Sequence, residues 1–229
     1  PPPPPPPPPP FFFFSHKRAW AILSGLVGSE MCIRDRDECD AHALSMWESD
    51  PDLPSAGDEL KMARKVMHDL EKIFPERTLL HSNHSSLIYR RALKHGMPRA
   101  YIKHYNDFLQ VGPGWKWVDD ITLPLSDGTE VFATHGIAAD GLKLSLQYGK
   151  HTIQGHFHSK ASIQYFSNPD SLVWSLQVGC LTKQSSLAFQ YARNFRMRFI
   201  ISTGAVIDGQ PVLFPMQMDK HGRWTGKIV

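Results

Sequence analysis

The spacing of apolar residues divides most of this chain into short helices and strands. Apolar side chains recur three or four positions apart between residues 56 and 74, which predicts an amphipathic helix. Pro75 follows directly and ends it. Residues 47–54 are predicted as a loop because two X-Pro pairs disfavour helix there. Three further helices are predicted, over 85–94, 99–110 and 141–149.

Short apolar runs between turn signals predict the strands. They cover 77–81, 121–125, 130–134, 151–154, 162–166, 172–178, 198–207 and 211–218. Two Asp-Gly pairs, Asp127-Gly128 and Asp208-Gly209, predict hairpins. Residues 112–117, Gly-Pro-Gly-Trp-Lys-Trp, are predicted as a loop whose tryptophans line either a core edge or a substrate cleft, the core edge being the commoner place. The mixed order of helices and strands predicts the α/β class.

Composition is that of a soluble globular protein. Of 229 residues, 41% are hydrophobic and 21% are charged. The net charge of +3 is too small by itself to indicate nucleic-acid binding. Outside the first 36 residues the chain has two cysteines, Cys39 and Cys180, too few for a disulfide framework. A reducing, cytoplasmic location is therefore expected.

The first 36 residues differ from the rest. Residues 1–10 are all proline and residues 11–14 all phenylalanine, and residues 24–36 resemble a translated sequencing-adapter read-through. We expect residues 1–36 to be a foreign or disordered leader and residues 37–229 to form the functional domain. A signal peptide is the alternative, because basic residues 16–18 precede the apolar stretch 19–28. That stretch is far shorter than the roughly 20 residues that span a bilayer, so no membrane segment is expected.

Side chains of the kinds that bind divalent metals follow several predicted strands. Carboxylate, amide oxygen and imidazole can together hold two divalent cations, the arrangement that hydrolyses phosphate esters. Two histidines that alternate after a strand are expected to point the same way. The candidates in chain order are Asp37 and Asp40, then Asn83-His84, then His135-Gly136, and then Gly155-His156-Phe157-His158. Five other histidines, His81, His95, His104, His151 and His221, are assigned structural or surface roles.

These residues resemble the motifs of the calcineurin-like metallophosphoesterases, of the bacterial or bacteriophage type. That family carries, in order, Asp-x-His, Gly-Asp-x-x-Asp, Gly-Asn-His-(Asp/Glu), His and Gly-His-x-His. Every block but the first is found between residue 37 and the C-terminus. The resemblance implies a four-layer αββα sandwich, here lacking its first strand. The chain departs from the pattern at Arg36 and Ser82, where the family has glycine, and at Ser85, where it has an acidic residue.

The resemblance also implies a role for each residue. The catalytic residue would be His84, which stabilises the transition state and protonates the leaving group. Asp40 would order its loop. The metal ligands would be Asp37 as the bridge, Asn83, His135 and His156 at the second metal, and His158 at the first.

The expected function is hydrolysis of a phosphate ester, either a diester or a monoester, by a metal-activated hydroxide. The cofactors would be two divalent ions, Mn²⁺ in the first place, with Fe, Zn or Mg as alternatives. One alternative is a nuclease with the same site, for which helical cations could supply a basic groove. The other is a metal-binding or interaction protein without turnover, because the Asp-x-His block is missing. The cations in question are Lys61, Arg64, Lys65, Arg90, Arg91 and Lys94.

Overall fold

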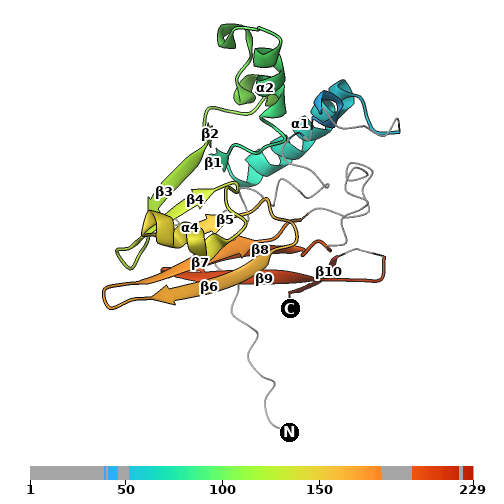
Figure 1. The fold of residues 1–229 in the computed structure, drawn as a ribbon. Helices are drawn as coiled ribbons and strands as arrows, with labels where there is room; N and C mark the ends of the chain where they lie inside the picture. Colours follow the sequence, from blue (N-terminus) through green and yellow to red (C-terminus); the bar gives the residue numbers. More distant parts are fainter. Residues whose placement is uncertain (1–38, 40, 46–51, 182–197, 222–223, 229) are drawn as a thin grey trace.

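The computed structural model describes residue 39 and residues 41–45, 52–181, 198–221 and 224–228 (Figure 1). The expected leader and two of the candidate site residues, Asp37 and Asp40, lie outside this part of the chain. The domain boundary expected at residue 37 therefore stays a prediction.

A five-stranded mixed sheet forms the centre of the fold. Its strands are β3 (Asp120–Pro124), β4 (Glu130–Thr134), β5 (His151–Gln154), β6 (Ala161–Ser167) and β7 (Leu172–Val178), in the spatial order β3-β4-β5-β7-β6. Strands β4, β5 and β7 are parallel, and the two edge strands are antiparallel to their neighbours. Helix α4 (Gly141–Tyr148) makes the crossover from β4 to β5. Parallel neighbours need such a crossover, and it brings their C-terminal ends to the same edge.

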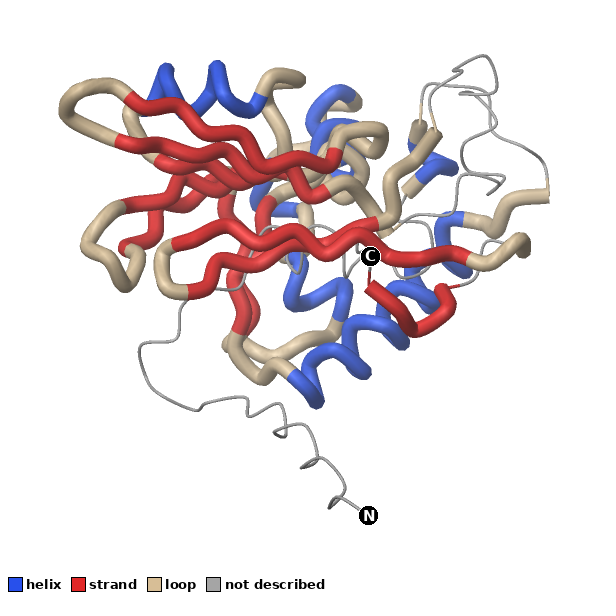
Figure 2. Tube along the Cα trace, turned by 90° about the horizontal axis from the view of Figure 1, so that it is seen from below, coloured by secondary structure: helices blue, strands red, loops and turns tan. Residues whose placement is uncertain are grey.

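A second sheet and α4 cover opposite faces of β7. Strands β8 (Ser202–Ile207), β9 (Gln210–Met218) and β10 (Trp224–Ile228) form an antiparallel sheet next to the first one (Figure 1 and Figure 2). A Cβ at Gly204 of β8 would lie 2.8 Å from Val178, whereas a Cβ at Gly141 of α4 would lie 2.2 Å from the Ser175 hydroxyl. Side chains three positions apart on a strand point to opposite faces, so β7 is sandwiched between a helix and a sheet.

A separate helical layer packs on a pair of short parallel strands, β1 (Arg77–Leu80) and β2 (Trp115–Val118). Adjacent residues of β1 enter different cores: Leu79 packs with α1 (Ala56–Ile73) and α3 (Tyr105–Leu109), and Leu80 packs with the five-stranded sheet. Trp115 is 1% exposed and its indole N–H donates to the Phe74 carbonyl at 2.9 Å. This tryptophan is therefore part of the core, as the commoner interpretation held. In Figure 1, α1 and α2 (Leu87–Lys94) lie at one end of the molecule and the larger sheets at the other.

Three sequence predictions about elements were wrong. The single helix over 99–110 is two pieces, the 3-10 helix η4 (Arg99–Tyr101) and α3, because Ile102 is extended. Residues 112–117 are not all loop as predicted, because strand β2 begins at Trp115. Residues 198–201 precede β8 rather than belonging to it, and β10 was not predicted.

The remaining elements follow the prediction closely. Helix α1 and strand β4 have nearly the predicted bounds, and both Asp-Gly hairpins form, between β3 and β4 and between β8 and β9. The α/β class is confirmed. Within the described residues, no helix combines the length and the apolar character needed to cross a membrane.

Candidate metal centre

Strand pairing brings Asn83 to His135, although 52 residues separate them in the chain. Strand β1 ends beside the β2–β3 junction, where His81 N–H donates to the Val118 carbonyl at 2.8 Å. The first residue of β3, Asp120, pairs with the last residue of β4, Thr134. The turn after β1 and the loop after β4 therefore meet at one edge. There the His135 Nε2 lies 3.0 Å from the Asn83 Oδ1.

The parallel pairing of β4 with β5 places His156 beside His135. The Gly155 N–H donates to the His135 carbonyl at 3.0 Å, which continues the ladder one step past the strands. The two imidazole rings are 5.1 Å apart between centroids. Gly136 makes this approach possible, because a Cβ there would lie 2.5 Å from the His156 Cβ. A side chain at position 136 would therefore clash with His156, so the short distance between the two loops requires the glycine that follows His135.

His156 has an unusual backbone. Its φ is +65°, and the N–H of Phe157 donates to the carbonyl of Gly155 at 2.7 Å, which closes a three-residue γ-turn around His156. A γ-turn with positive φ is rare and strained, and strain of this kind in a residue other than glycine occurs where the surrounding structure enforces it. The turn aims the His156 ring at the loop that carries His135.

Strand β5 ends before His156 and His158, so whether their side chains point the same way stays a prediction. Residues 155–160 are not a strand, so the pleated alternation does not apply to them. The His158 ring meets the edge of Phe199 at 4.8 Å, and its carbonyl accepts from the Ile200 N–H at 2.8 Å. His158 is thereby tied to the segment that leads into β8.

The contact between Asn83 and His135 is a hydrogen bond in this structure, and its length is also compatible with two ligands of one divalent cation. Two ligand atoms at right angles on one octahedral ion, each about 2.1 Å away from it, are about 3.0 Å apart. That is the distance between Asn83 Oδ1 and His135 Nε2. Two imidazoles on one ion have centroids about 4.5–5.5 Å apart by the same geometry, which includes the distance between His135 and His156.

In the described part of the chain, no three side chains of His, Cys, Asp or Glu converge as a metal cluster. His135 and His156 supply two such groups, and Asn83 adds an amide oxygen. The carboxylate expected at this centre is Asp37, which lies outside the described residues. Asn83, His135 and His156 are therefore the described members of the predicted two-metal arrangement, which stays a prediction.

A network of serines holds the turn that presents Asn83 and His84. The Ser82 hydroxyl accepts from the Ser85 N–H at 3.0 Å and lies 2.8 Å from the Ser85 hydroxyl, and both serines are buried. These are two of the positions at which the chain departs from the family pattern. Each serine is a hydrogen-bond partner of the other. The carbonyl of His84, which is half-buried, accepts from the Leu87 N–H at the start of α2.

Gln154 is a site residue that the sequence prediction missed. It is the last residue of β5 and is fully buried, at 0% exposure. Its amide donates to the Ala138 carbonyl at 2.6 Å and accepts from the Ile137 N–H at 3.4 Å. One side chain therefore links the loop after His135 to the strand that delivers His156. A polar residue at the end of an otherwise buried strand was the available signal.

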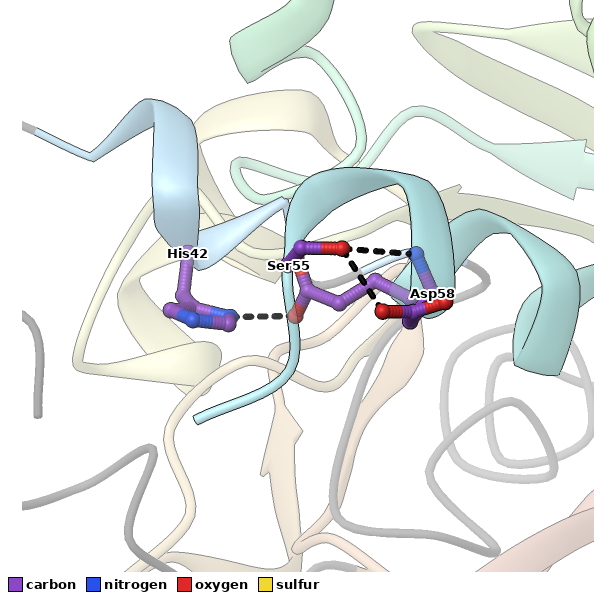
Figure 3. Close-up of polar contacts among 4 residues, drawn as sticks. His42, Ser55 and Asp58 are labelled. Atoms are coloured by element: carbon purple, nitrogen blue, oxygen red, sulfur yellow. Dashed lines mark hydrogen bonds and ion pairs between the residues drawn. The ribbon is translucent and has the colours of Figure 1, made fainter. Parts of the chain in front are cut away.

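Residue 39 and residues 41–45 are anchored to the helical core and α1. Cys39 and Ala41 are buried in the helical core, and the His42 ring pairs with the Glu59 carboxylate, both side chains being buried. Figure 3 shows where His42 lies relative to the start of α1. Figure 3 also shows the start of α1, where the Ser55 hydroxyl accepts from the Asp58 N–H at 3.2 Å. The pair His42–Glu59 was not predicted, because nothing in the local sequence of either residue indicates the other.

His151 and His81 are two of the histidines to which the sequence analysis assigns structural or surface roles. His151 is buried, stacks on Trp174 at 4.5 Å and accepts from the Trp174 N–H. Burial lowers the pKa of His151, opposed by the nearby Asp127 carboxylate. Burial likewise lowers the pKa of His81, opposed by Asp119. Both rings are held near the neutral form, which suits a structural role.

Comparison with known proteins gives little to add. No family model matches the chain, and no curated protein matches it. A solved structure that resembles it is an archaeal phosphodiesterase, with a TM-score of 0.29 and 14% sequence identity over 74% of this chain and 91% of the other. A TM-score this low does not establish a common fold.

Proposed function

We propose that this protein is a metal-dependent phosphoesterase of the calcineurin-like class. The observation that carries the proposal is the contact of Asn83 Oδ1 with His135 Nε2 at 3.0 Å, with the ring of His156 beside that of His135 on a strained γ-turn. Three strand ends, far apart in the sequence, contribute one donor each to the same edge. The four-layer sandwich of that class is part of the proposal.

Five residues would hold the metal ions. Asn83, His135 and His156 would bind one of them, and Asp37 and His158 would complete the site as the sequence motifs imply. The bound ions, proposed to be Mn²⁺, would supply a hydroxide near neutral pH and neutralise charge on the phosphate. The amide oxygen and the two imidazoles are suitable donors for first-row divalent cations.

His84 would transfer a proton to the leaving group. In hydrolysis the water oxygen forms a bond to phosphorus, the bond from phosphorus to the ester oxygen breaks, and the departing oxygen takes up a proton. An imidazole has the right pKa range to deliver that proton near neutral pH. His84 directly follows Asn83, and the buried pair Ser82–Ser85 fixes the turn. We assign His84 as the proton donor on this basis.

Hydrolysis of a chromogenic phosphodiester with added Mn²⁺ tests the proposal. We expect turnover that EDTA abolishes, and a loss of at least 100-fold in kcat for His84→Ala, the scale of general-acid catalysis. His156→Ala should lose both activity and Mn²⁺ binding, measured directly by calorimetry. Replacing the exposed His95 by alanine is the matched control and should change neither.

The two readouts separate the alternatives. Activity that survives both His84→Ala and His156→Ala would refute the assignment. Mn²⁺ binding that requires His156, without any hydrolysis, would instead identify a metal-binding or interaction protein.

A further inference from the structure

The segment next to the candidate site is strongly cationic. Residues 77–106 contain six lysines and arginines and no aspartate or glutamate. The remaining 19 Lys and Arg are outnumbered by 22 Asp and Glu, so the rest of the chain carries a net charge of −3. A polyanion approaching the protein would therefore be attracted to this segment rather than to the molecule as a whole.

Most of this charge lies on residues 87–104, here called the basic hairpin, which comprises α2, the turn at Gly96 and η4. The hairpin is a folded projection: the Tyr89 hydroxyl donates to the Lys103 carbonyl at 2.8 Å, and the Met97 N–H donates to the Ala92 carbonyl at 3.0 Å. Figure 1 shows α2 at the outer end of the molecule. Every residue from 93 to 101 is exposed.

An aromatic ring lies among these cations. Tyr101 is 78% exposed and the neighbouring Met97 is 45% exposed. The exposed cations Lys94, Arg99 and Lys103 lie within seven residues of Tyr101 on either side. A ring face with surrounding cations is the arrangement that binds single-stranded nucleic acids, where bases stack on the ring and phosphates meet the cations.

Several other cations have partners within the protein. Arg64 donates to the Phe108 carbonyl at 2.7 Å, Arg91 to the Leu44 carbonyl, and Lys61 pairs with Asp58. The basic surface of the hairpin includes the exposed cations Lys94, Arg99 and Lys103.

The hairpin is continuous with the candidate metal centre. The Arg90 guanidinium donates to the Asn83 carbonyl at 2.6 Å, so the first turns of α2 contact the turn that presents the metal ligand. A polyanionic chain bound along the hairpin would therefore extend to Asn83.

We propose that the basic hairpin binds the backbone of a single-stranded nucleic acid and presents one of its phosphodiesters to the metal centre. Lys94, Arg99 and Lys103 contact phosphates, and Tyr101 stacks on a base. The choice of substrate rests on the proposed phosphoesterase function, but the binding surface stands on the charge and exposure of the hairpin. A duplex fits less well, because its bases are already stacked and offer no face to Tyr101.

Fluorescence anisotropy with a labelled oligothymidylate in EDTA tests the binding surface without hydrolysis. The triple variant Lys94→Gln, Arg99→Gln, Lys103→Gln should bind at least tenfold more weakly. Its slope of log affinity against log salt should be smaller by about 2, since each phosphate contact on a single strand contributes about 0.7. Tyr101→Ala should bind at least fivefold more weakly with an unchanged slope, because stacking is not ionic.

Matched controls keep the two proposals distinguishable. The triple variant Lys61→Gln, Lys65→Gln, Lys72→Gln removes the same charge from α1 and should bind the oligonucleotide like the wild type. Hydrolysis of the small chromogenic ester should be unchanged in all these variants, because none of the altered residues is in the metal centre.

Each other outcome has a definite meaning. Wild-type oligonucleotide binding by the hairpin variant, or an equal loss in the α1 variant, would overturn the inference. Binding to phosphatidylserine vesicles without oligonucleotide binding would overturn it in favour of a membrane surface. Hairpin-dependent oligonucleotide binding by a protein that hydrolyses no ester would keep the binding surface and overturn the proposed function.

Discussion

Replacing Gln154 by leucine tests how the candidate centre is held together. The side chain is fully buried and makes two hydrogen bonds to the loop after His135, at 2.6 Å to the Ala138 carbonyl and 3.4 Å from the Ile137 N–H. Leucine has a similar volume but no polar group. It would leave the Ala138 carbonyl without this donor, at a cost of about 1–3 kcal/mol. Loss of the longer hydrogen bond, from the Ile137 N–H, adds little to this free-energy cost.

Two assays measure the effect of Gln154→Leu. With a urea m-value of about 2 kcal/mol/M, the midpoint of unfolding should fall by about 0.5–1.5 M. The second assay is the increase of that midpoint on adding saturating Mn²⁺, which for an ion at 100 times its Kd corresponds to about 2.7 kcal/mol. In Gln154→Leu this increase should be smaller, because the loop that carries His135 is no longer tied to the strand that delivers His156.

Gln177→Leu is the matched control. Gln177 is also buried, at 4% exposure, and donates to the Ala139 carbonyl at 3.3 Å, but it lies one strand further from His156. It should lower the midpoint in the absence of metal and keep the wild-type response to Mn²⁺. An unchanged Mn²⁺ response in Gln154→Leu, or an equal loss in both variants, would refute the idea that Gln154 positions the ligands.

Three further predictions concern single residues. Gly136→Ala should reduce Mn²⁺ binding measured by calorimetry, because the new methyl group would lie 2.5 Å from the His156 Cβ. His151 has a folded-state pKa below its unfolded value, so its contribution to stability is complete above about pH 6.5 and declines as the pH falls toward the folded pKa. His151→Gln should flatten that part of the pH dependence of the urea midpoint. Glu59→Ala should lower the free energy of unfolding by about 1–3 kcal/mol, because the buried His42 ring loses its hydrogen bond to the Glu59 carboxylate.

Each of these three predictions has a control on the same molecule. Gly57→Ala adds a methyl group in α1 where the nearest atom is 3.9 Å away, and should leave Mn²⁺ binding intact. Replacing the exposed His95 by glutamine should keep the wild-type pH dependence. Asp69→Asn breaks an exposed pair with Lys72 and should leave the midpoint almost unchanged. A control that behaves like its test variant would contradict the corresponding prediction.

The local sequence was a good guide where local interactions decide the structure. The apolar spacing of residues 56–74 and the cap at Ser55 determine α1, and the Asp-Gly pairs determine both hairpins. It failed at residues 99–110, where Tyr101 and Phe108 have helical spacing. Tyr101 is 78% exposed and Phe108 is buried, so the two do not share a face. Packing of α3 into the helical core, rather than periodicity, decided that break.

Strand β2 is a second element that the local sequence did not predict. The Gly-Pro-Gly sequence before Trp115 favours a loop, but the Trp115–Val118 segment pairs with β1, which lies some 35 residues earlier. A four-residue parallel strand is stable only against its partner, and no window of sequence contains both.

The sequence by itself determined which chemical groups the candidate centre can use. Asn83, His84, His135 and His156 were selected because each follows a predicted strand and carries an oxygen or nitrogen donor. Only the tertiary structure decided which of them meet. Parallel pairing of β4 with β5 and antiparallel pairing of β3 with β4 bring their ends to one edge, and the γ-turn at His156 sets its direction. Distances between strand ends depend on pairing register, which is fixed by contacts between distant residues and not by the residues beside each ligand.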